Sequence, residues 1–233
     1  MQSMTKNILW PEYQGKPVTW KVKMKKEYLV EDMNYLDSMV ARPIFNKQAD
    51  IIIDNNCKGI VDIGCRMGMP NHIIYKKGYR DYNYMGFDTS PLPIAKANED
   101  WKDHSNVEYR VGTWDDEKVL KVDFDVDTLI MSGVLIYCQP CHEEFYAESG
   151  YHTDLFDRLV NYYKPKRVII QETLKEQTHI HEDKSHETID LSYYKKFDHD
   201  WYEFDLDMWL GHRVVMDVRA VSYTHLRAHE TQP

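Results

Sequence analysis

The sequence predicts an α/β fold: a doubly wound, mostly parallel seven-stranded sheet with helices on both faces and a C-terminal antiparallel hairpin. Two observations lead to this prediction. From Ile60 to Gln171, short apolar runs alternate with segments whose apolar residues recur at helical spacing, a pattern typical of a parallel sheet. Further along, two strand-like segments flank Leu210–His212, which is typical of a hairpin.

Five parallel strands are expected, each a short run rich in β-branched or aromatic residues. They are Ile60–Ile63, Tyr82–Phe87, Val107–Val111, Val126–Met131 and Arg167–Gln171. Val126–Met131 is apolar on both faces, which predicts a central place in the sheet. The hairpin is expected from Trp201–Trp209 and Arg213–Val218.

Helices are expected where apolar residues recur every three to four positions and Gly or Pro marks an end. They are Glu27–Val40, Ile44–Asn55, Asn71–Lys77, Pro91–Asp100 and Asp154–Tyr163. Pro43 is expected to interrupt the chain between the first two helices, Gly78 to close the third and Pro165 to stop the last.

The domain organisation follows from these elements. We expect an N-terminal extension or cap over 1–43, one domain over 44–220 and a non-native tail over 221–233. The tail is set apart because its residues 221–231 resemble a translated sequencing adapter. Within the extension, Lys16–Lys26 alternates apolar and basic residues, which is typical of an edge strand. Its five Lys either form a solvated face or meet an acidic partner.

Composition excludes several classes of protein. The 233 residues are 42% hydrophobic and carry a formal net charge of −9, which disfavours broad adhesion to nucleic acid or to an anionic membrane. The longest apolar stretches are about eight residues, against the ~20 that a spanning helix needs. Without a secretory signal at its start and with only four Cys, the chain is expected to be cytoplasmic and free of membrane.

A glycine turn follows the first predicted strand and is the first candidate site. Asp62–Gly68 has the spacing G-x-x-x-G. Gly64 allows a sharp turn there, and Gly68 is expected to let the backbone approach a ligand. Ligands of parallel sheets bind at the carboxyl ends of the strands. Asp88, at the end of the next strand, can accept hydrogen bonds from both hydroxyls of a ribose. The turn alone is a weak signal, and Asp88 gives it weight.

These motifs resemble those of the class I S-adenosylmethionine (SAM)-dependent methyltransferases. The resemblance runs from about Ile44 to Arg219 and is tightest over Val61–Ala97. It implies SAM as cofactor and transfer of a methyl group to an unidentified, small-molecule acceptor. The cofactor-binding residues that it implies are Asp62, Gly64, Cys65, Arg66, Gly68, Asp88, Thr89, Thr113, Trp114, Asp115, Ser132 and Gly133.

The chain departs from the family pattern at two of these residues. Arg66 stands where many members have a third Gly, so its side chain either crowds the cofactor or points outward. Asp115, the acid that would meet the adenine amino group, lies three residues after its glycine rather than next to it.

Three residues near the expected site are candidates for catalysis. Methyl transfer from a sulfonium mainly needs the reactants to be positioned, and a general base matters only if the nucleophile carries a proton. His142, in the loop after the fourth strand, could take that proton near neutral pH. Tyr137 in the same loop and Glu172 at the end of the fifth strand could orient a substrate or be structural.

Other interpretations of the same residues compete with these. Cys138–His142 matches the C-x-x-C-H pattern of haem attachment, and its two Cys with His142 or later His could bind zinc. We expect no metal, and instead two reduced Cys and a loop His. No Asp/Asn-Pro-Pro-Tyr/Phe sequence follows the fourth strand, which argues against the amino-directed DNA methyltransferases. Nucleic-acid binding through Lys16–Lys26 is a possible but disfavoured role. The alternative function is a non-catalytic SAM-binding or partner-binding module of the same fold.

Overall fold

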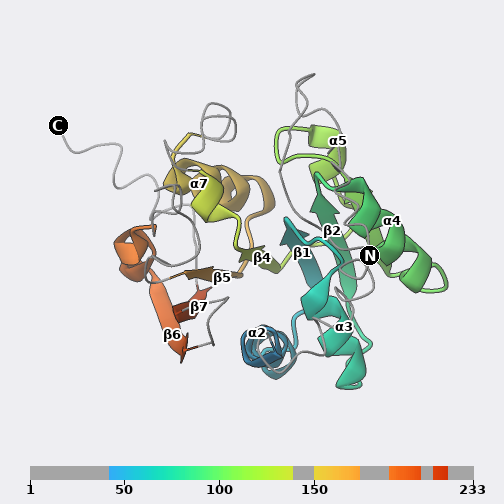
Figure 1. Cartoon of the computed structure of the whole chain (residues 1–233), viewed down its shortest axis with the longest axis horizontal. Helices are drawn as coiled ribbons and strands as arrows, with labels where there is room; N and C mark the ends of the chain where they lie inside the picture. The colour runs from blue at the N-terminus through green and yellow to red at the C-terminus, as the bar shows by residue number, and fades with distance from the viewer. Residues whose placement is uncertain (1–41, 139–149, 174–188, 206–211, 220–233) are drawn as a thin grey trace, which may run out of the picture.

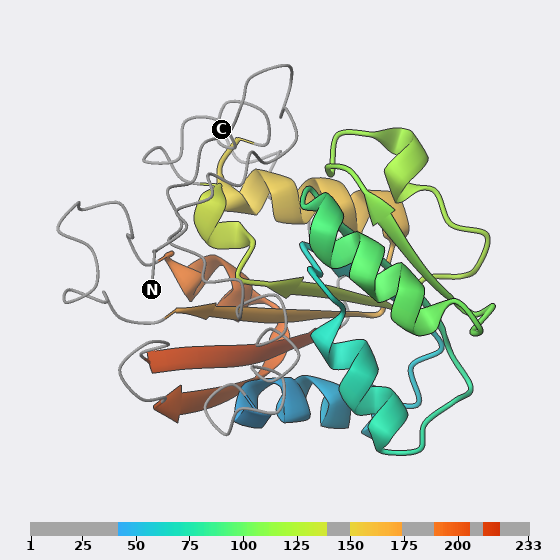
Figure 2. The same ribbon diagram turned by 45° about the vertical axis from the view of Figure 1, so that its right-hand side comes forward.

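The computed structural model describes residues 42–138, 150–173, 189–205 and 212–219, and its elements are labelled in Figure 1. Within these residues, one seven-stranded sheet carries helices on both of its faces (Figures 1 and 2). The predicted extension up to residue 41 and the tail from 221 onward lie outside the described residues, and with them the predicted strand Lys16–Lys26 and helix Glu27–Val40.

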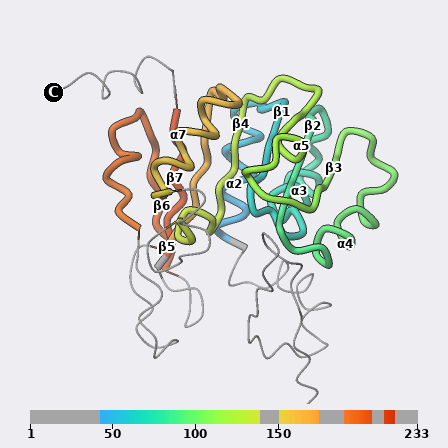
Figure 3. Tube along the Cα trace, turned by 90° about the horizontal axis from the view of Figure 1, so that it is seen from above, coloured from blue at the N-terminus to red at the C-terminus, as the bar shows by residue number. Residues whose placement is uncertain are grey.

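The sheet has the strand order β3-β2-β1-β4-β5-β7-β6. Its strands are β1 Gly59–Ile63, β2 Asn83–Asp88, β3 Val107–Val111, β4 Thr128–Ser132, β5 Arg167–Thr173, β6 Asp198–Asp205 and β7 His212–Arg219. Neighbours among β1 to β5 are parallel, whereas β7 is antiparallel to both β5 and β6. The prediction of a mostly parallel sheet closed by an antiparallel pair is therefore confirmed. Figure 3 shows the strands following one another from β6 to β3.

The direction of the strand order reverses at β1. The chain builds β1, β2 and β3 outward on one side, then returns to place β4 against the other side of β1. Ligands of open α/β sheets bind outside the carboxyl ends of the strands at such a switch point. The fold therefore places a candidate site at the ends of β1, β2 and β4.

The helices divide between the two faces. They are α2 Arg42–Asp54, α3 Met69–Lys76, α4 Pro91–Trp101, α5 Glu117–Leu120 and α7 His152–Tyr163, with 3₁₀ turns η1 Leu135–Tyr137 and η2 Leu191–Lys196. Residues of α2, α3 and α4 pack in one hydrophobic core, and residues of α5, α7, η1 and η2 pack in the other. Figure 2 shows α2 and α7 on opposite sides of the sheet.

Successive side chains of β1 point to opposite faces of the sheet, so the strand contributes residues to both hydrophobic cores. Ile60 packs in the core under α2, α3 and α4, while Val61 and Ile63 pack in the core under α5 and α7. All five residues of β1 are buried, as expected for a central strand of a parallel sheet. Asp62 is thus a carboxyl group in a fully buried strand, which makes it a candidate for function.

Several predicted boundaries were wrong for identifiable reasons. α2 begins at Arg42 rather than Ile44, and Pro43 lies in its first turn, where its missing N–H costs no hydrogen bond. The expected interruption between this helix and the one before it involves residues outside the described part of the chain. β4 begins at Thr128 rather than Val126. Asp127, just before it, uses its carboxylate to accept the Lys58 N–H (2.8 Å). The short α5, η1 and η2 give no periodic signal and were not predicted.

The hairpin strands are longer than predicted at their outer ends. β6 begins at Asp198 rather than Trp201, although Asp is rare in strands. Arg219 on β7 pairs with both Asp198 and Asp200 and so offsets their repulsion. Residues 206–211, which contain most of the predicted turn Leu210–His212, lie outside the described residues.

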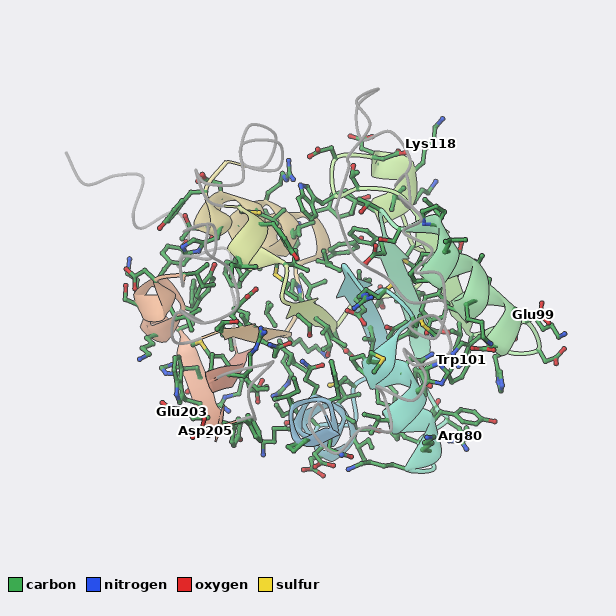
Figure 4. The ribbon with its side chains drawn as sticks, in the orientation of Figure 1. Arg80, Glu99, Trp101, Lys118, Glu203 and Asp205 are labelled. Atoms are coloured by element: carbon green, nitrogen blue, oxygen red, sulfur yellow. The ribbon has the colours of Figure 1, made fainter. Side chains whose placement is uncertain are left out.

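The rims of the molecule are charged. Figure 4 shows Glu203 and Asp205 of β6 at one end of the molecule and Glu99 of α4 at the other. Within the described residues, no helix is both long enough and apolar enough to cross a membrane.

Candidate functional site

The glycine turn wraps over the end of β2. The backbone N–H groups of Gly64 and Cys65 both donate to the carbonyl oxygen of Phe87 (2.9 and 3.0 Å), and the Gly68 N–H donates back to the Cys65 carbonyl (2.8 Å). The turn that follows β1 is therefore attached to the strand that carries Asp88. This juxtaposition brings the first and second predicted motifs together.

The Asp88 carboxylate accepts hydrogen bonds from the backbone around the turn and retains further acceptor positions. Its Oδ2 accepts the Arg66 backbone N–H (3.0 Å), and its Oδ1 accepts the Ser90 N–H (2.8 Å). A carboxylate offers about four lone-pair positions, so about two remain for a ligand. Asp88 is 8% exposed. A buried carboxylate with about two spare acceptor positions fits the two hydroxyls of a ribose.

Gly64 and Gly68 are needed for conformation and for space. Both have positive φ, +67° and +71°. A Cβ on Gly64 would lie 2.5 Å from Val134 Cγ2, and a Cβ on Gly68 would lie 2.0 Å from the Tyr109 hydroxyl oxygen. On the side where a Cβ would stand, Gly68 makes room for Tyr109 of β3, and the expected approach of its backbone to a ligand remains a prediction. This contact with Tyr109 was not predicted from the sequence.

Arg66 adopts the left-handed conformation in place of the family's glycine. Its φ is +50°, a conformation that costs a residue with a Cβ about 1–2 kcal/mol. The bond from its N–H to Asp88 favours this geometry. Its side chain is exposed, and whether it crowds the cofactor or points outward remains a prediction.

Asp62 lies behind the turn, in a cluster of buried tyrosines. It is 1% exposed, and the Tyr84 hydroxyl donates to its Oδ2. Burial raises the pKa of the Asp62 carboxyl to about 7, partly opposed by the Tyr84 bond and reinforced by the nearby charge of Asp88. Burial also raises the pKa of the Cys65 thiol well above its ordinary value. Cys65 is therefore not poised to react as a thiolate.

The end of β4 adds open space beside these groups. Gly133 has a φ of +64°, and a Cβ added there would meet nothing within 4 Å among the described residues. The neighbouring Ser132 accepts a hydrogen bond from Gln48 Nε2 of α2 (2.8 Å). Sequence reasoning missed Gln48, which is fully buried. Its signal was a polar residue in line with Ile44 and Ile52 on the apolar face of a helix.

The segment after β3 lies beside Asp88. The Gly112 N–H donates to the Asp88 carbonyl (3.0 Å), so Thr89 and Thr113 follow adjacent strand ends. Trp114 is buried in the core under α7. Asp115 forms an ion pair with Arg158 of α7 (3.0 Å). The cofactor-binding roles of Thr89, Thr113, Trp114 and Asp115, with Asp115 toward the adenine amino group, remain predictions.

Glu172 positions the turn that carries Tyr137. Its side chain is fully buried, and its Oε1 accepts the Leu135 N–H at the start of η1 (2.9 Å). Its Oε2 is buried with no hydrogen-bond partner among the described residues. Burial raises the pKa of the Glu172 carboxyl to about 8, opposed first by Arg213 and then by the N–H groups of η1. At neutral pH Glu172 is therefore mostly a neutral acid.

Tyr137 lies among charged groups from several strand ends. Burial raises the pKa of its hydroxyl, and the hydroxyl interacts electrostatically with Glu172, Arg66, Asp88 and Arg213. Sequence reasoning missed Arg213, which lies at the start of β7. It therefore reaches the edge at which the parallel strands end, because β7 is antiparallel to β5.

The structure describes only some of the residues considered for catalysis or metal binding in the loop after β4. His142 and Cys141 lie outside the described residues. Cys138 is fully buried, in keeping with a reduced structural thiol. Among the described residues, no three or more His, Cys, Asp or Glu side chains are grouped as metal ligands would be.

The buried acid Glu172 should give folding stability a characteristic pH dependence. The pKa of Glu172 is higher in the folded state than its ordinary value of 4.5. Below pH 4.5 Glu172 is protonated in both the folded and the unfolded state, so it makes no pH-dependent contribution to stability there. Above pH 4.5 the unfolded chain releases the Glu172 proton while the folded chain keeps it. The free energy of unfolding therefore falls by up to ~1.4 kcal/mol per pH unit until pH passes about 8, where the folded chain releases the proton too. Glu172→Gln should remove this contribution. The variant is expected to be more stable than the wild type at pH ~8.5, but not at pH ~5.

Denaturant unfolding at both pH values measures this difference. Glu117→Gln, at an exposed position of α5, is the matched control and should change stability equally at both pH values. An equal effect of Glu172→Gln at both pH values would show that Glu172 does not titrate as described.

Comparison with known proteins identifies the fold. No protein-family model and no curated protein matches the sequence. Solved structures do match, among them magnesium protoporphyrin IX methyltransferase from Synechocystis PCC 6803 with bound SAM. Its TM-score is 0.54 at 15% sequence identity, and the match covers 84% of this chain and 86% of that chain.

Two further matches agree. A putative O-methyltransferase from Klebsiella pneumoniae has a TM-score of 0.55 at 10% identity, with 83% of this chain and 89% of that chain covered. An O-methyltransferase family protein from Burkholderia thailandensis has a TM-score of 0.54 at 11% identity. That match covers 84% of this chain but only 62% of the other. At these identities the likeness shows the Rossmann-like methyltransferase fold, as the sequence predicted.

Proposed function

We propose that the chain is a SAM-dependent methyltransferase that acts on a small-molecule acceptor. The observation that carries this proposal is the carboxylate of Asp88. It lies at the switch point of the sheet, is bonded to the backbone of the glycine turn, and retains acceptor positions for ribose hydroxyls. The methyltransferase fold of the solved structures supports the same assignment.

The carboxylates of the site fit the proposed cofactor. Asp88 would hold the ribose, and Asp62, with its pKa near 7, would gain charge stabilisation from the cofactor's amino group. The open space at Gly133 leaves room at the end of β4. The remaining residues that the family resemblance implies, among them Thr89, Thr113 and Asp115, complete the proposed site.

The chain's part in the chemistry is mainly to position the reactants. When bound, SAM would supply a methyl group on a positively charged sulfur. The acceptor attacks the methyl carbon in line with the carbon–sulfur bond, and the sulfur leaves as the neutral thioether of S-adenosylhomocysteine. Because the reaction neutralises charge, the protein needs to align the acceptor and exclude water rather than stabilise new charge. Tyr137, whose raised pKa keeps its hydroxyl protonated, can donate a hydrogen bond to the acceptor. Glu172 fixes Tyr137 in place through η1.

A general base is needed only for an acceptor that loses a proton. His142 remains our proposal for that role, with Tyr137 as an orienting group. A small-molecule acceptor is favoured over nucleic acid because the net charge is −9. A nucleic-acid phosphate backbone would be repelled by such a surface outside a local basic patch.

Turnover of SAM tests this proposal. The full chain is incubated with SAM and metabolite extracts, and S-adenosylhomocysteine is quantified by mass spectrometry, together with any compound that gains one methyl group. We expect S-adenosylhomocysteine to form with the wild type and to fall to background with Asp88→Ala at low SAM. SAM that is bound but never consumed, across all extracts, would instead identify a non-catalytic SAM-binding module.

A further inference from the structure

We propose that Tyr84 is a positioning residue for the cofactor: its hydroxyl holds the Asp62 carboxylate, whose negative charge meets the amino group of bound SAM. This inference rests on the proposed function and adds a residue that the family resemblance does not imply. It follows from a buried hydrogen bond directly behind the glycine turn.

Tyr84 of β2 reaches Asp62 of the neighbouring strand β1. Its backbone is in register with Ile60, whereas the register partner of Asp62 is Gly86. The Tyr84 hydroxyl therefore donates to Asp62 Oδ2 diagonally, from the adjacent register pair. Both residues are only 1% exposed, and a hydrogen bond in such surroundings is stronger than one in water.

The surrounding cluster holds Tyr84 in this orientation. Its ring lies against Tyr109 of β3, with 5.5 Å between the ring centroids. The Tyr109 hydroxyl accepts a hydrogen bond from Asn71 Nδ2 (3.0 Å), and Asn71 Oδ1 accepts one from the Tyr82 hydroxyl (2.6 Å). All of these residues are buried. The donor to Asp62 is therefore fixed before any ligand binds, as a positioning residue requires.

Among the described residues, Asp62 has a hydrogen-bond donor but no Lys, Arg or His as partner. The titratable groups that act on it come from β2, β3 and the glycine turn, and all are neutral or acidic: Tyr84, Asp88, Tyr109 and Cys65. The helices α2 and α3 on that face contribute none, and its register partner on β4 is the apolar Ile130. Buried charges in proteins are paired, so an ionised Asp62 lacks a positive partner that the amino group of SAM would provide.

The Tyr84 bond sets how much of the protein carries this charge before a ligand binds. Burial raises the pKa of the Asp62 carboxyl to about 7, and the Tyr84 bond opposes that rise. Without the hydroxyl the pKa would be higher still, so fewer Asp62 carboxyls would be ionised at pH ~6.5. The amino group would then bind only after Asp62 released its proton to solvent, which weakens binding. At pH ~8.5 the loss is smaller, because Asp62 ionises more readily there even without the bond.

Two ligands that differ in the amino-acid part test the inference. S-adenosylhomocysteine carries that part, and 5′-methylthioadenosine is the same nucleoside thioether ending in a methyl group. Each is titrated calorimetrically into the full wild-type chain and into Tyr84→Phe at pH ~6.5 and ~8.5. The ligand's own amino group titrates alike with both proteins, so its effect cancels in the comparison.

The expected loss is confined to one ligand and is larger at the lower pH. At pH ~6.5, Tyr84→Phe should bind S-adenosylhomocysteine about 5- to 30-fold more weakly than the wild type does, because a hydrogen bond to a charged group is lost. The affinity for 5′-methylthioadenosine should change less than about twofold. At pH ~8.5 the loss for S-adenosylhomocysteine should shrink to about threefold.

Tyr82→Phe is the matched control. Tyr82 is also a buried tyrosine, but its hydroxyl donates to Asn71 and not to Asp62. Its replacement should leave both affinities within about twofold of the wild type at both pH values. Asp62→Asn keeps an oxygen for the Tyr84 hydroxyl but carries no charge. It should bind S-adenosylhomocysteine weakly at both pH values, and adding Tyr84→Phe should weaken binding little further. Melting curves check that each variant is folded during the titrations.

Other outcomes overturn the inference. Equal losses for the two ligands, or equal losses for S-adenosylhomocysteine at both pH values, would give Tyr84 a purely structural role and leave the proposed function intact. The same conclusion follows if Tyr82→Phe behaves like Tyr84→Phe. Should Tyr84→Phe not fold, Asp62→Asn decides, because an undiminished preference for S-adenosylhomocysteine would show that the Asp62 charge does not meet the amino group. If neither ligand binds the wild type, the proposed function fails as well.

Discussion

Asp88→Ala is expected to weaken SAM binding roughly 30- to 1000-fold. The carboxylate would accept two charge-assisted hydrogen bonds from ribose hydroxyls, each worth ~1.5–3 kcal/mol and not fully additive, so the loss should be about 2–4 kcal/mol. The variant also frees the Arg66 and Ser90 N–H groups, which loosens the turn that borders the cofactor. Isothermal titration calorimetry measures the change in affinity directly.

Asp88→Asn is the matched control for that experiment. It keeps one carbonyl oxygen for a backbone N–H but loses the negative charge, so its loss of affinity should lie between those of the wild type and Asp88→Ala. Circular dichroism at the working temperature checks that each variant is folded. A change below about threefold for folded Asp88→Ala would place the ribose elsewhere, because a single lost charged hydrogen bond already exceeds it.

Gly68→Ala should lower the melting temperature by about 4–20 °C. The left-handed backbone costs a Cβ-bearing residue ~1–2 kcal/mol. The added methyl would also meet the buried Tyr109 side chain, 2.0 Å from its hydroxyl oxygen and 2.6 Å from its ring carbons, which adds ~1–3 kcal/mol of overpacking. Tyr109 cannot easily move, because its hydroxyl accepts a hydrogen bond from Asn71 Nδ2 (3.0 Å). For a chain of this size, each kcal/mol corresponds to ~2–4 °C.

Gly78→Ala separates the cost of the left-handed backbone from the cost of overpacking. Gly78 also has a positive φ, +88°, but a Cβ there would meet nothing within 4 Å among the described residues. It should therefore show only the conformational cost, about 1–2 kcal/mol. Equal falls in melting temperature for the two variants would mean that Tyr109 does not crowd Gly68.

The elements that position the site could be predicted from local sequence. β1 and β2 are short apolar runs, and the turn and Asp88 lie where such runs end, so their meeting at one edge follows from the parallel sheet alone. The strand order is not encoded locally in this way. The order β3-β2-β1-β4-β5-β7-β6 was not predicted and became visible only in the structure.

The interior of the site could not be predicted in the same way. Tyr84 and Tyr109 appear in the sequence as ordinary strand residues, yet one donates to Asp62 and the other fills the space over Gly68. Glu172 was a candidate for substrate orientation, and its bond to the Leu135 N–H became visible only in the structure. These contacts join side chains from different strands, and periodicity within one element carries no information about such pairings.

The measurement that tests the central claim most directly is a calorimetric titration of the full chain with SAM. The structure predicts saturable binding at one site per chain, with a dissociation constant in about the 1 μM–1 mM range typical of enzyme ligands, and competition by S-adenosylhomocysteine. A folded chain that shows neither heat of binding nor a rise in melting temperature with SAM above ~1 mM would contradict the assignment of the Asp88 edge as a SAM site.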